Sequence, residues 1–191
     1  MKPAITILAI AGSLREGSLN RRLVEASVDV APESVRVIPF DLSGIPLYNG
    51  DLEAAGDPEP VLVFKRALLE ADGLLIVTPE YNSGMPGVLK NALDWASRPP
   101  RPLVGLPLAV IGATPGRWGT LQAQLDVQRV ARHIGMLPMP SPSLHVSEAR
   151  QVFDPNGALV DPGTRDRLKA VVLGLEAWIQ RVSVTAGVEA A

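Results

Sequence analysis

Apolar positions along the chain follow two alternating patterns. Short runs of apolar, mostly β-branched residues are typical of buried strands. Between these runs, apolar residues recur at the spacing of one face of a helix. The runs that predict strands cover residues 4–10, 35–40, 73–77 and 106–112, with a weaker one at residues 136–144.

The helical pattern follows each of these runs. It is clearest near the end of the chain, where Leu168, Leu175 and Ile179 lie on one stripe. The segment between residues 40 and 58 shows no such pattern and is predicted to be a long loop. The other predicted helices cover residues 19–30, 58–71, 86–97 and 120–134.

The succession of strand–helix units predicts the fold class. Parallel strands need crossover connections, which are usually helical. The alternation therefore predicts an α/β protein with a doubly wound, five-stranded parallel sheet and helices on both faces. The chain has 191 residues, 47% of them apolar, which suits a single domain. We expect that domain to cover residues 1–183, followed by a flexible tail over residues 184–191, where the pattern is weak.

Charge and composition exclude several classes of function. Eighteen basic and 20 acidic side chains give a net charge of −2, so the chain has no overall basic field for nucleic acid. Cysteine is absent, which excludes thiolate catalysis and zinc–thiolate sites, and no other metal site is predicted. The apolar runs are far shorter than the roughly 20 residues of a membrane-spanning helix.

The first residues imitate a short secretory leader. An apolar run follows Lys2 and ends in Ala9-Ile10-Ala11, which is similar to a cleavage site. Cleavage there would remove the first predicted strand. We therefore expect a cytoplasmic protein that binds neither nucleic acid nor membrane.

Candidate chemistry lies in the loops that follow the predicted strands, because ligands of such sheets bind at the carboxyl ends of strands. The loop after the first strand reads GSLREGSLN over residues 12–20 and leads into a helix. Free backbone N–H groups and the positive end of the helix dipole meet there, which predicts a phosphate site. A helix cap at Ser18 alone fits the sequence equally well. The polar side chains of this loop are Ser13, Arg15, Ser18 and Asn20.

Two nucleotide motifs nearly match this loop and fail. The dinucleotide pattern G-x-G-x-x-G needs glycine where Leu14 stands. The nucleoside-triphosphatase pattern G-x-x-x-x-G-K-[ST] needs lysine where Ser18 stands. A single phosphate monoester is therefore the expected ligand.

The loop after the third strand reads TPEYNSGMPG over residues 78–87. It is rich in turn residues, and its two prolines stiffen it. A rigid loop with exposed N–H groups beside the ring of Tyr81 suits a flat heteroaromatic ligand with polar edges. A plain turn, with Tyr81 packed on the core, is the alternative.

The two loops together carry a recognisable pattern. The motif G-S-L-R-x-x-S-x-N at residues 12–20 and the motif P-E-Y-N-x-x-x-P-G-x-L-K-N-A-L-D-W at residues 79–95 resemble those of the NADPH-dependent FMN reductase family. The resemblance extends through the order of elements from residue 4 to about residue 182. It implies a flavodoxin-like fold, FMN as cofactor, and NADPH or NADH as co-substrate. The family includes quinone, chromate and azo-dye reductases.

The resemblance also implies roles for individual residues. Serine usually stands two residues after Asn82 in the family, whereas this chain has Gly84 there and Ser83 one position earlier, which puts a hydroxyl contact in doubt. Residues 113–119 occupy the position of the family's loop that closes on the flavin. The residues implied to hold the FMN phosphate are Ser13, Arg15, Ser18 and Asn20; those along the ring and ribityl chain are Pro79, Glu80, Tyr81, Asn82 and Ser83; and the third loop adds Thr114 and Gly116.

The implied activity is that of an FMN-dependent NAD(P)H oxidoreductase. Hydride would pass from NADPH to the flavin, and electrons then to a quinone-like, azo or metal-oxyanion acceptor. No catalytic side chain is named, because the cofactor carries the chemistry. Two alternatives stay open: a reductase that supplies free reduced flavin to a monooxygenase, and a non-enzymatic electron carrier of the flavodoxin type.

The resemblance further implies a homodimer or homotetramer with the flavin near a subunit interface. The apolar helix face that contains Leu93 and Trp95 is a candidate for that interface. Trp118, between two glycines in the third loop, is a candidate cover for the site. Arg15 and Arg117 are both candidates to meet the 2′-phosphate that distinguishes NADPH from NADH.

Overall fold

The computed structural model describes residues 4–189, with side chains as far as residue 183. All strand pairs are parallel, and the order along the sheet is β2-β1-β3-β4-β5, with β6 also paired to β4. This is the strand order of flavodoxin-like folds, so the predicted fold class is confirmed. The strands are β1 (Ile5–Ala11), β2 (Val35–Phe40), β3 (Gly73–Val77), β4 (Pro107–Ala113), β5 (Leu137–Pro138) and β6 (Leu144–Val146).

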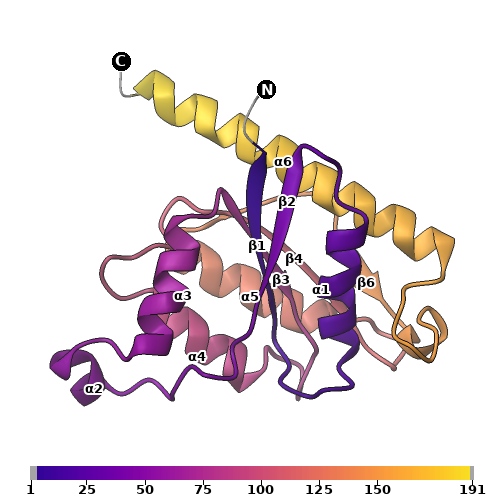
Figure 1. Ribbon diagram of the computed structural model, residues 1–191, viewed down its shortest axis with the longest axis horizontal. Coiled ribbons are helices and arrows are strands. Elements are labelled where there is room, and N and C mark those ends of the chain that lie inside the picture. The colour runs from indigo at the N-terminus through magenta and orange to yellow at the C-terminus, as the bar shows by residue number, and fades with distance from the viewer. Residues whose placement is uncertain (1–3, 190–191) are drawn as a thin grey trace.

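Helices cover both faces of the sheet (Figure 1). Successive side chains of a strand point to opposite faces, so Ile7 and Ala9 of β1 enter one core while Leu8 and Ile10 enter the other. The first core lies under α1 (Leu19–Asp29) and α6 (Pro162–Glu189). The second lies under α3 (Glu59–Leu69), α4 (Gly87–Ala96) and α5 (Leu121–His133).

The fifth strand differs from its prediction. Instead of one strand over residues 136–144, two short strands pair with the same edge of β4. Leu137 lies opposite Pro107, and Leu144 lies opposite Ile111. The segment between β5 and β6 contains Pro140 and Pro142, which have no N–H to donate to a ladder, so the pairing is interrupted there.

The segment predicted as a long loop contains a short helix, α2 (Gly50–Ala55). The Asn49 side chain caps it by accepting a hydrogen bond from the Asp51 N–H at 2.9 Å. None of its residues is buried. Hydrophobic spacing therefore carries no signal for this helix.

The proposed interface through Leu93 and Trp95 was wrong. Both side chains are at most 1% exposed, so neither can meet a second subunit. The indole N–H of Trp95 donates to the carbonyl of Pro46 at 2.9 Å, and the Asn91 amide donates to the same carbonyl at 2.8 Å. These residues fix the start of the α2 segment on α4.

At the other end of the chain, α6 continues to Glu189. The division between a domain of residues 1–183 and a flexible tail stays a prediction, and residues 190–191 lie outside the described part. Among the helices of residues 4–189, none is both long and apolar enough to cross a membrane.

Gly112 allows the close approach on which the carboxyl edge of the sheet depends. A Cβ at this position would lie 2.1 Å from Thr120 Oγ1 and 2.2 Å from the Thr78 carbonyl oxygen. Both distances are far below any real contact. Glycine at position 112 of β4 therefore lets Thr120, the residue before α5, pack close to Thr78 at the end of β3.

Candidate functional site

Three loops meet at the carboxyl edge of the sheet, at the bottom of Figure 1. Loop 1 is residues 12–18, loop 2 is residues 78–86 and loop 3 is residues 114–120. A cavity of about 440 Å³ lies among them, here called the loop cavity. All the predicted site residues line it except Asn82, Ser83 and Gly116. Its lining residues are Ser13, Arg15, Ser18, Leu19, Asn20, Pro79, Glu80, Tyr81, Ala113, Thr114 and Pro115.

Two serines give loop 1 its hydrogen-bonding character. Ser18 caps α1, because its Oγ accepts from the N–H groups of Asn20 at 3.2 Å and Arg21 at 3.3 Å. Neither bond uses the hydroxyl proton of Ser18. Ser13 is 5% exposed, and its hydroxyl has no partner among the described residues. A buried hydroxyl left unpaired costs about 1–3 kcal/mol, so this position suits a ligand that accepts hydrogen bonds.

Asn20 joins loop 1 to the end of β4. Its Nδ2 donates to the Ala113 carbonyl at 2.9 Å, and its Oδ1 accepts from the Ala113 N–H at 2.9 Å. The side chain is buried. Asn20 is therefore a positioning residue, whatever contact its remaining amide hydrogen makes.

Loop 2 ends in a tight turn. Tyr81 and Gly84 exchange two backbone hydrogen bonds of 3.1 Å, and the residues between them, Asn82 and Ser83, have φ values of 51° and 61°. Positive φ at both central positions defines a type I′ turn. Asparagine adopts this conformation readily, whereas for serine it costs about 1–2 kcal/mol. The turn holds Asn82 and Ser83 at its tip, which is why neither lines the loop cavity.

Gly84 is not required by the backbone. Its φ is not positive, and a Cβ there would make an ordinary 3.6 Å contact with Asp126 Oδ2. The position would therefore accept the serine that the family usually has. In the order Ser83-Gly84, the serine occupies the position with positive φ, and the glycine occupies a position where any residue is free of backbone strain.

Two carboxylates tie loop 2 to α5. Glu80 Oε2 accepts from the Ala123 N–H at 3.1 Å, in the first turn of α5, where no side chain of the helix itself acts as a cap. A negative charge is favourable at that end of a helix. Asp126 Oδ2 accepts from the Met85 N–H at 3.3 Å. Hydrogen bonding from Arg129 is the main reason that the pKa of Asp126 lies below its ordinary value.

Loop 3 rests on residues 148–149, for which no role is predicted from the sequence. The Glu148 N–H donates to the Gly116 carbonyl at 2.9 Å, and the Ala149 N–H donates to the Thr114 carbonyl at 2.9 Å. Thr114 Oγ1 also accepts from the Gly116 N–H at 3.2 Å. Trp118 does not cover the loop cavity, because its side chain is 89% exposed.

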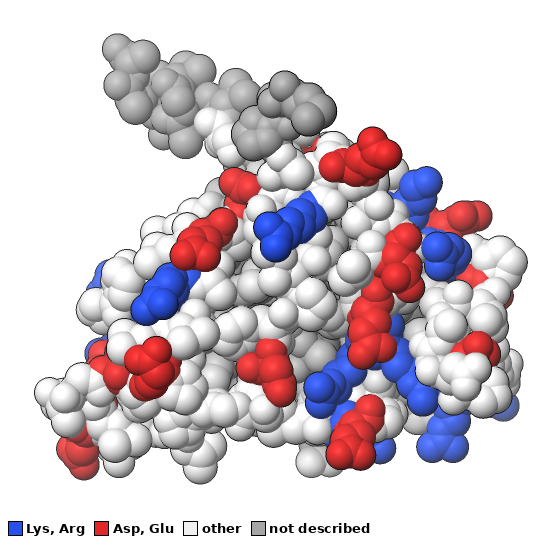
Figure 2. All heavy atoms as spheres, in the orientation of Figure 1, with Lys and Arg blue, Asp and Glu red and all other residues white. Residues whose placement is uncertain are grey.

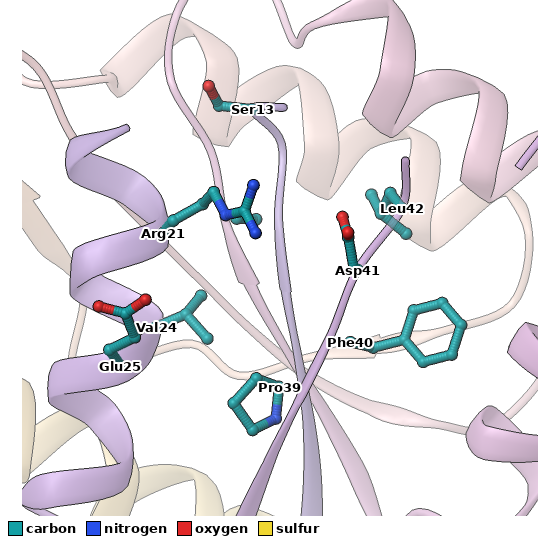
Figure 3. Close-up of a pocket in the computed structure, with 9 residues that line it drawn as sticks. Ser13, Arg21, Val24, Glu25, Pro39, Phe40, Asp41 and Leu42 are labelled. Atoms are coloured by element: carbon teal, nitrogen blue, oxygen red, sulfur yellow. The ribbon is translucent and has the colours of Figure 1, made fainter. Parts of the chain in front are cut away.

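A second hollow, of about 170 Å³, lies between α1 and the end of β2 (Figure 3). Arg21 and Asp41 face one another across it, and Glu25 also lines it. The pKa of Asp41 is lowered, mainly by the hydroxyl of Ser43 and to a smaller extent by Arg21. Charges of both signs line this hollow and compensate one another. It is therefore less favourable for binding an anion than the loop cavity is.

The sequence matches the profile of the NADPH-dependent FMN reductase family over residues 5–151. The chain belongs to this family. Membership confirms the predicted class, an oxidoreductase that uses FMN and a nicotinamide nucleotide.

Individual members of the family are similar over nearly the whole chain. An NAD(P)H-dependent FMN reductase of Pseudomonas aeruginosa is 40% identical over 183 residues, 95% of this chain and 99% of that protein. A 2-hydroxy-1,4-benzoquinone reductase of a Burkholderia species is 40% identical over 179 residues, 93% of this chain and 97% of that one. The solved flavoenzyme NAD(P)H:(acceptor) oxidoreductase of Paracoccus denitrificans has a TM-score of 0.86 at 33% identity, covering 93% and 98% of the two chains.

Removing the Asn20 amide should destabilise this FMN reductase family member. Asn20→Ala deletes two hydrogen bonds and leaves the buried Ala113 N–H and carbonyl unpaired. We expect the free energy of unfolding to fall by about 2–4 kcal/mol. Urea denaturation measures this, with Asn156→Ala in an exposed turn as the control. Equal effects of the two substitutions would contradict the positioning role.

A pH dependence should come from His145, which lies beneath loop 3. Burial lowers the pKa of His145 below its ordinary value of 6.5, and its Nδ1 has no partner among the described residues. As the pH falls through 6.5, His145 becomes protonated in the unfolded chain but stays neutral in the folded one. The contribution of neutral His145 to the free energy of unfolding is therefore fully present above pH 6.5 and declines below it.

Denaturation of the wild type and His145→Asn between pH 5 and 8 checks this expectation. The wild type should lose stability relative to His145→Asn as the pH falls. His133→Asn, at an exposed histidine, is the control and should track the wild type. Parallel curves for the wild type and His145→Asn would refute the assignment.

Proposed function

We propose that this family member is an FMN-dependent NAD(P)H:quinone oxidoreductase. The observation that carries the proposal is the loop cavity, which joins a phosphate-type loop to a rigid loop with an aromatic ring. A quinone as acceptor is supported by the Burkholderia relative, whose name specifies a benzoquinone. Azo compounds and metal oxyanions are the other acceptor classes.

The phosphate of FMN fits loop 1. The Ser13 hydroxyl is buried and unpaired, and that of Ser18 keeps its proton free to donate. The guanidinium of Arg15 lines the cavity and makes no hydrogen bond or ion pair with the described residues. Together with the first N–H groups of α1, these groups supply the donors that a phosphate monoester needs. Asn20 holds the loop in this arrangement.

The flavin ring fits loops 2 and 3. Pro79, Glu80 and Tyr81 line the cavity on one side, and Thr114 lines it on another. The N–H groups of Asn82 and Ser83 make no hydrogen bond within the described residues, so we propose that they donate to the edge of the ring where it extends past the cavity along loop 2. We propose that Gly116 approaches the other end of the ring through its Cα, because its N–H and carbonyl are engaged by Thr114 and Glu148.

When bound, FMN supplies the redox chemistry, by taking two electrons from the nicotinamide nucleotide and passing them to the acceptor. The protein's own task is to bind and orient. Tyr81 is 47% exposed at the cavity, so it forms a wall without closing the site. One oxygen of the Glu80 carboxylate is held by the first turn of α5, which positions this side chain at the wall of the cavity. An open, rigid site of this kind suits a flat acceptor.

Assembly and location are further proposals. We propose a homodimer or homotetramer that covers exposed apolar side chains near loops 2 and 3, namely Tyr81, Trp118, Leu121 and Leu125. We also propose a cytoplasmic location. Its support is that the leader-like run forms β1, which pairs with strands on both sides and would be lost by cleavage after Ala11.

The function is tested by visible spectroscopy of the purified protein with FMN under anaerobic conditions. NADPH should bleach a perturbed flavin band, and a benzoquinone should restore it through repeated cycles without any added reductase. The flavin-supplying alternative would be favoured if the quinone reoxidises only reduced flavin that has left the protein and passed an ultrafiltration membrane. Absence of bleaching by either NADPH or NADH would favour an electron carrier and refute the proposal.

Arg15→Ala should weaken FMN binding. Loss of a charge-assisted hydrogen bond to phosphate is worth about 1.5–3 kcal/mol, or roughly a 10- to 150-fold rise in Kd. Quenching of flavin fluorescence measures the affinity. Arg36→Ala, at an exposed residue of β2, removes the same charge elsewhere and should leave the Kd unchanged. An unaltered Kd in Arg15→Ala would remove Arg15 from the phosphate site.

A further inference from the structure

Another hollow, distinct from the one between α1 and β2, adjoins the loop cavity on the far side of loop 1. Its volume is about 450 Å³, and Arg15 and Pro115 line both spaces. Two more arginines, Arg22 from α1 and Arg150 from the 3₁₀ helix Ala149–Gln151, also line it. We call this space the arginine hollow.

Its charge is strongly one-sided. Within the described residues, the guanidinium groups of Arg15, Arg22 and Arg150 make no hydrogen bond or ion pair. Asp154 is the one acidic residue in the lining, and its Oδ1 already accepts from the Ala158 N–H at 2.9 Å. Figure 2 shows several basic side chains over the N-terminal end of α1, with acidic side chains beside them outside the lining of the hollow. Three arginines without partners around one space are suited to an anion.

The Arg22 side chain packs against the backbone of a turn. Gly157 has a φ of 95° at the end of a turn closed by its own N–H and the Asp154 carbonyl, 3.0 Å apart. A Cβ at Gly157 would lie 3.0 Å from Arg22 Nε and 3.4 Å from its Cζ. The backbone of the turn therefore lies against the guanidinium group. Phe153, 7% exposed, supplies an apolar wall.

The hydroxyls that suit the FMN phosphate do not belong to this space. Ser13 and Ser18 line the loop cavity and are absent from the arginine hollow. A second phosphate, carried by the molecule that enters the loop cavity beside FMN, would meet Arg22 and Arg150, because Arg15 is engaged by the FMN phosphate. A hollow of this volume has room for a ribose together with the phosphate that it carries.

We propose that the arginine hollow binds the 2′-phosphate of NADPH and makes the enzyme selective for NADPH over NADH. The proposal rests on the proposed function. Arginine is suited to this task, because its planar group binds phosphate through two parallel hydrogen bonds. A dianionic 2′-phosphate gains from the positive charges of Arg22 and Arg150, whereas NADH has only a hydroxyl at that position.

Steady-state kinetics of the FMN-loaded enzyme test this selectivity. Arg22→Gln and Arg150→Gln should each lower kcat/KM for NADPH by about 10- to 100-fold, mainly through KM, as expected for loss of a charge-assisted hydrogen bond. For NADH, kcat/KM should change by less than about twofold. Arg36→Gln is the matched control and should change neither value.

Direct binding gives a readout that does not depend on turnover. Calorimetric titration of the FMN-loaded enzyme with 2′,5′-ADP and with 5′-AMP separates the 2′-phosphate from the rest of the nucleotide. We expect 2′,5′-ADP to bind at least about tenfold more tightly than 5′-AMP, and this difference to disappear in Arg150→Gln. Because Arg150 is exposed, this variant keeps the test available if Arg22→Gln unfolds.

Three results would overturn the proposal. Equal losses for NADPH and NADH would assign the arginines to a part shared by both nucleotides. A weaker affinity for FMN in Arg22→Gln or Arg150→Gln would assign them to the flavin. Unchanged binding of 2′,5′-ADP in both variants would exclude a 2′-phosphate site. Failure of the wild type to bind FMN would instead refute the proposed function, and titration of 2′,5′-ADP would still test the hollow.

Discussion

The paired hydrogen bonds between Asn20 and Ala113 are the constraint on which the site depends. The last register of β3 on β4 joins Val77 to Ile111, so the N–H and carbonyl of Ala113 lie beyond the reach of that strand. The amide of Asn20 satisfies both groups and so extends the pairing of β4 with a side chain. Loop 1 is thereby fixed to the strand from which loop 3 begins. Ser13 and Arg15 are left facing the cavity without intramolecular partners.

Most of the other polar groups around the cavity also serve position. The carboxylates of Glu80 and Asp126 accept hydrogen bonds from backbone N–H groups of α5 and loop 2, respectively. The backbone of residues 148–149 supports loop 3. A site whose own acids are engaged in this way has little side-chain chemistry to offer. That agrees with a family in which a bound cofactor performs the reaction and the protein fixes its surroundings.

The sequence predicted those features that follow from local patterns. Periodicity located the strands and the long helices, and the rule that ligands bind at strand ends selected the three loops. It missed α2, which buries nothing, and the break in the fifth strand, which arises from missing N–H groups at prolines. It also missed Asp126 and Arg150, because their roles depend on neighbours that are remote in the sequence. The tip position of Asn82 depends on the sign of φ, which no periodicity reveals.

The two edges of the sheet share one property. Pro39 lies in β2 at one edge, and Pro138 lies in β5 at the other, where the fifth strand is also broken. An edge strand that is short or contains proline is a poor template for another strand, which is how natural sheets avoid joining edge to edge. Copies of this protein are thus protected from aggregating through a continuous sheet. Contacts through helices and loops are not restricted in this way.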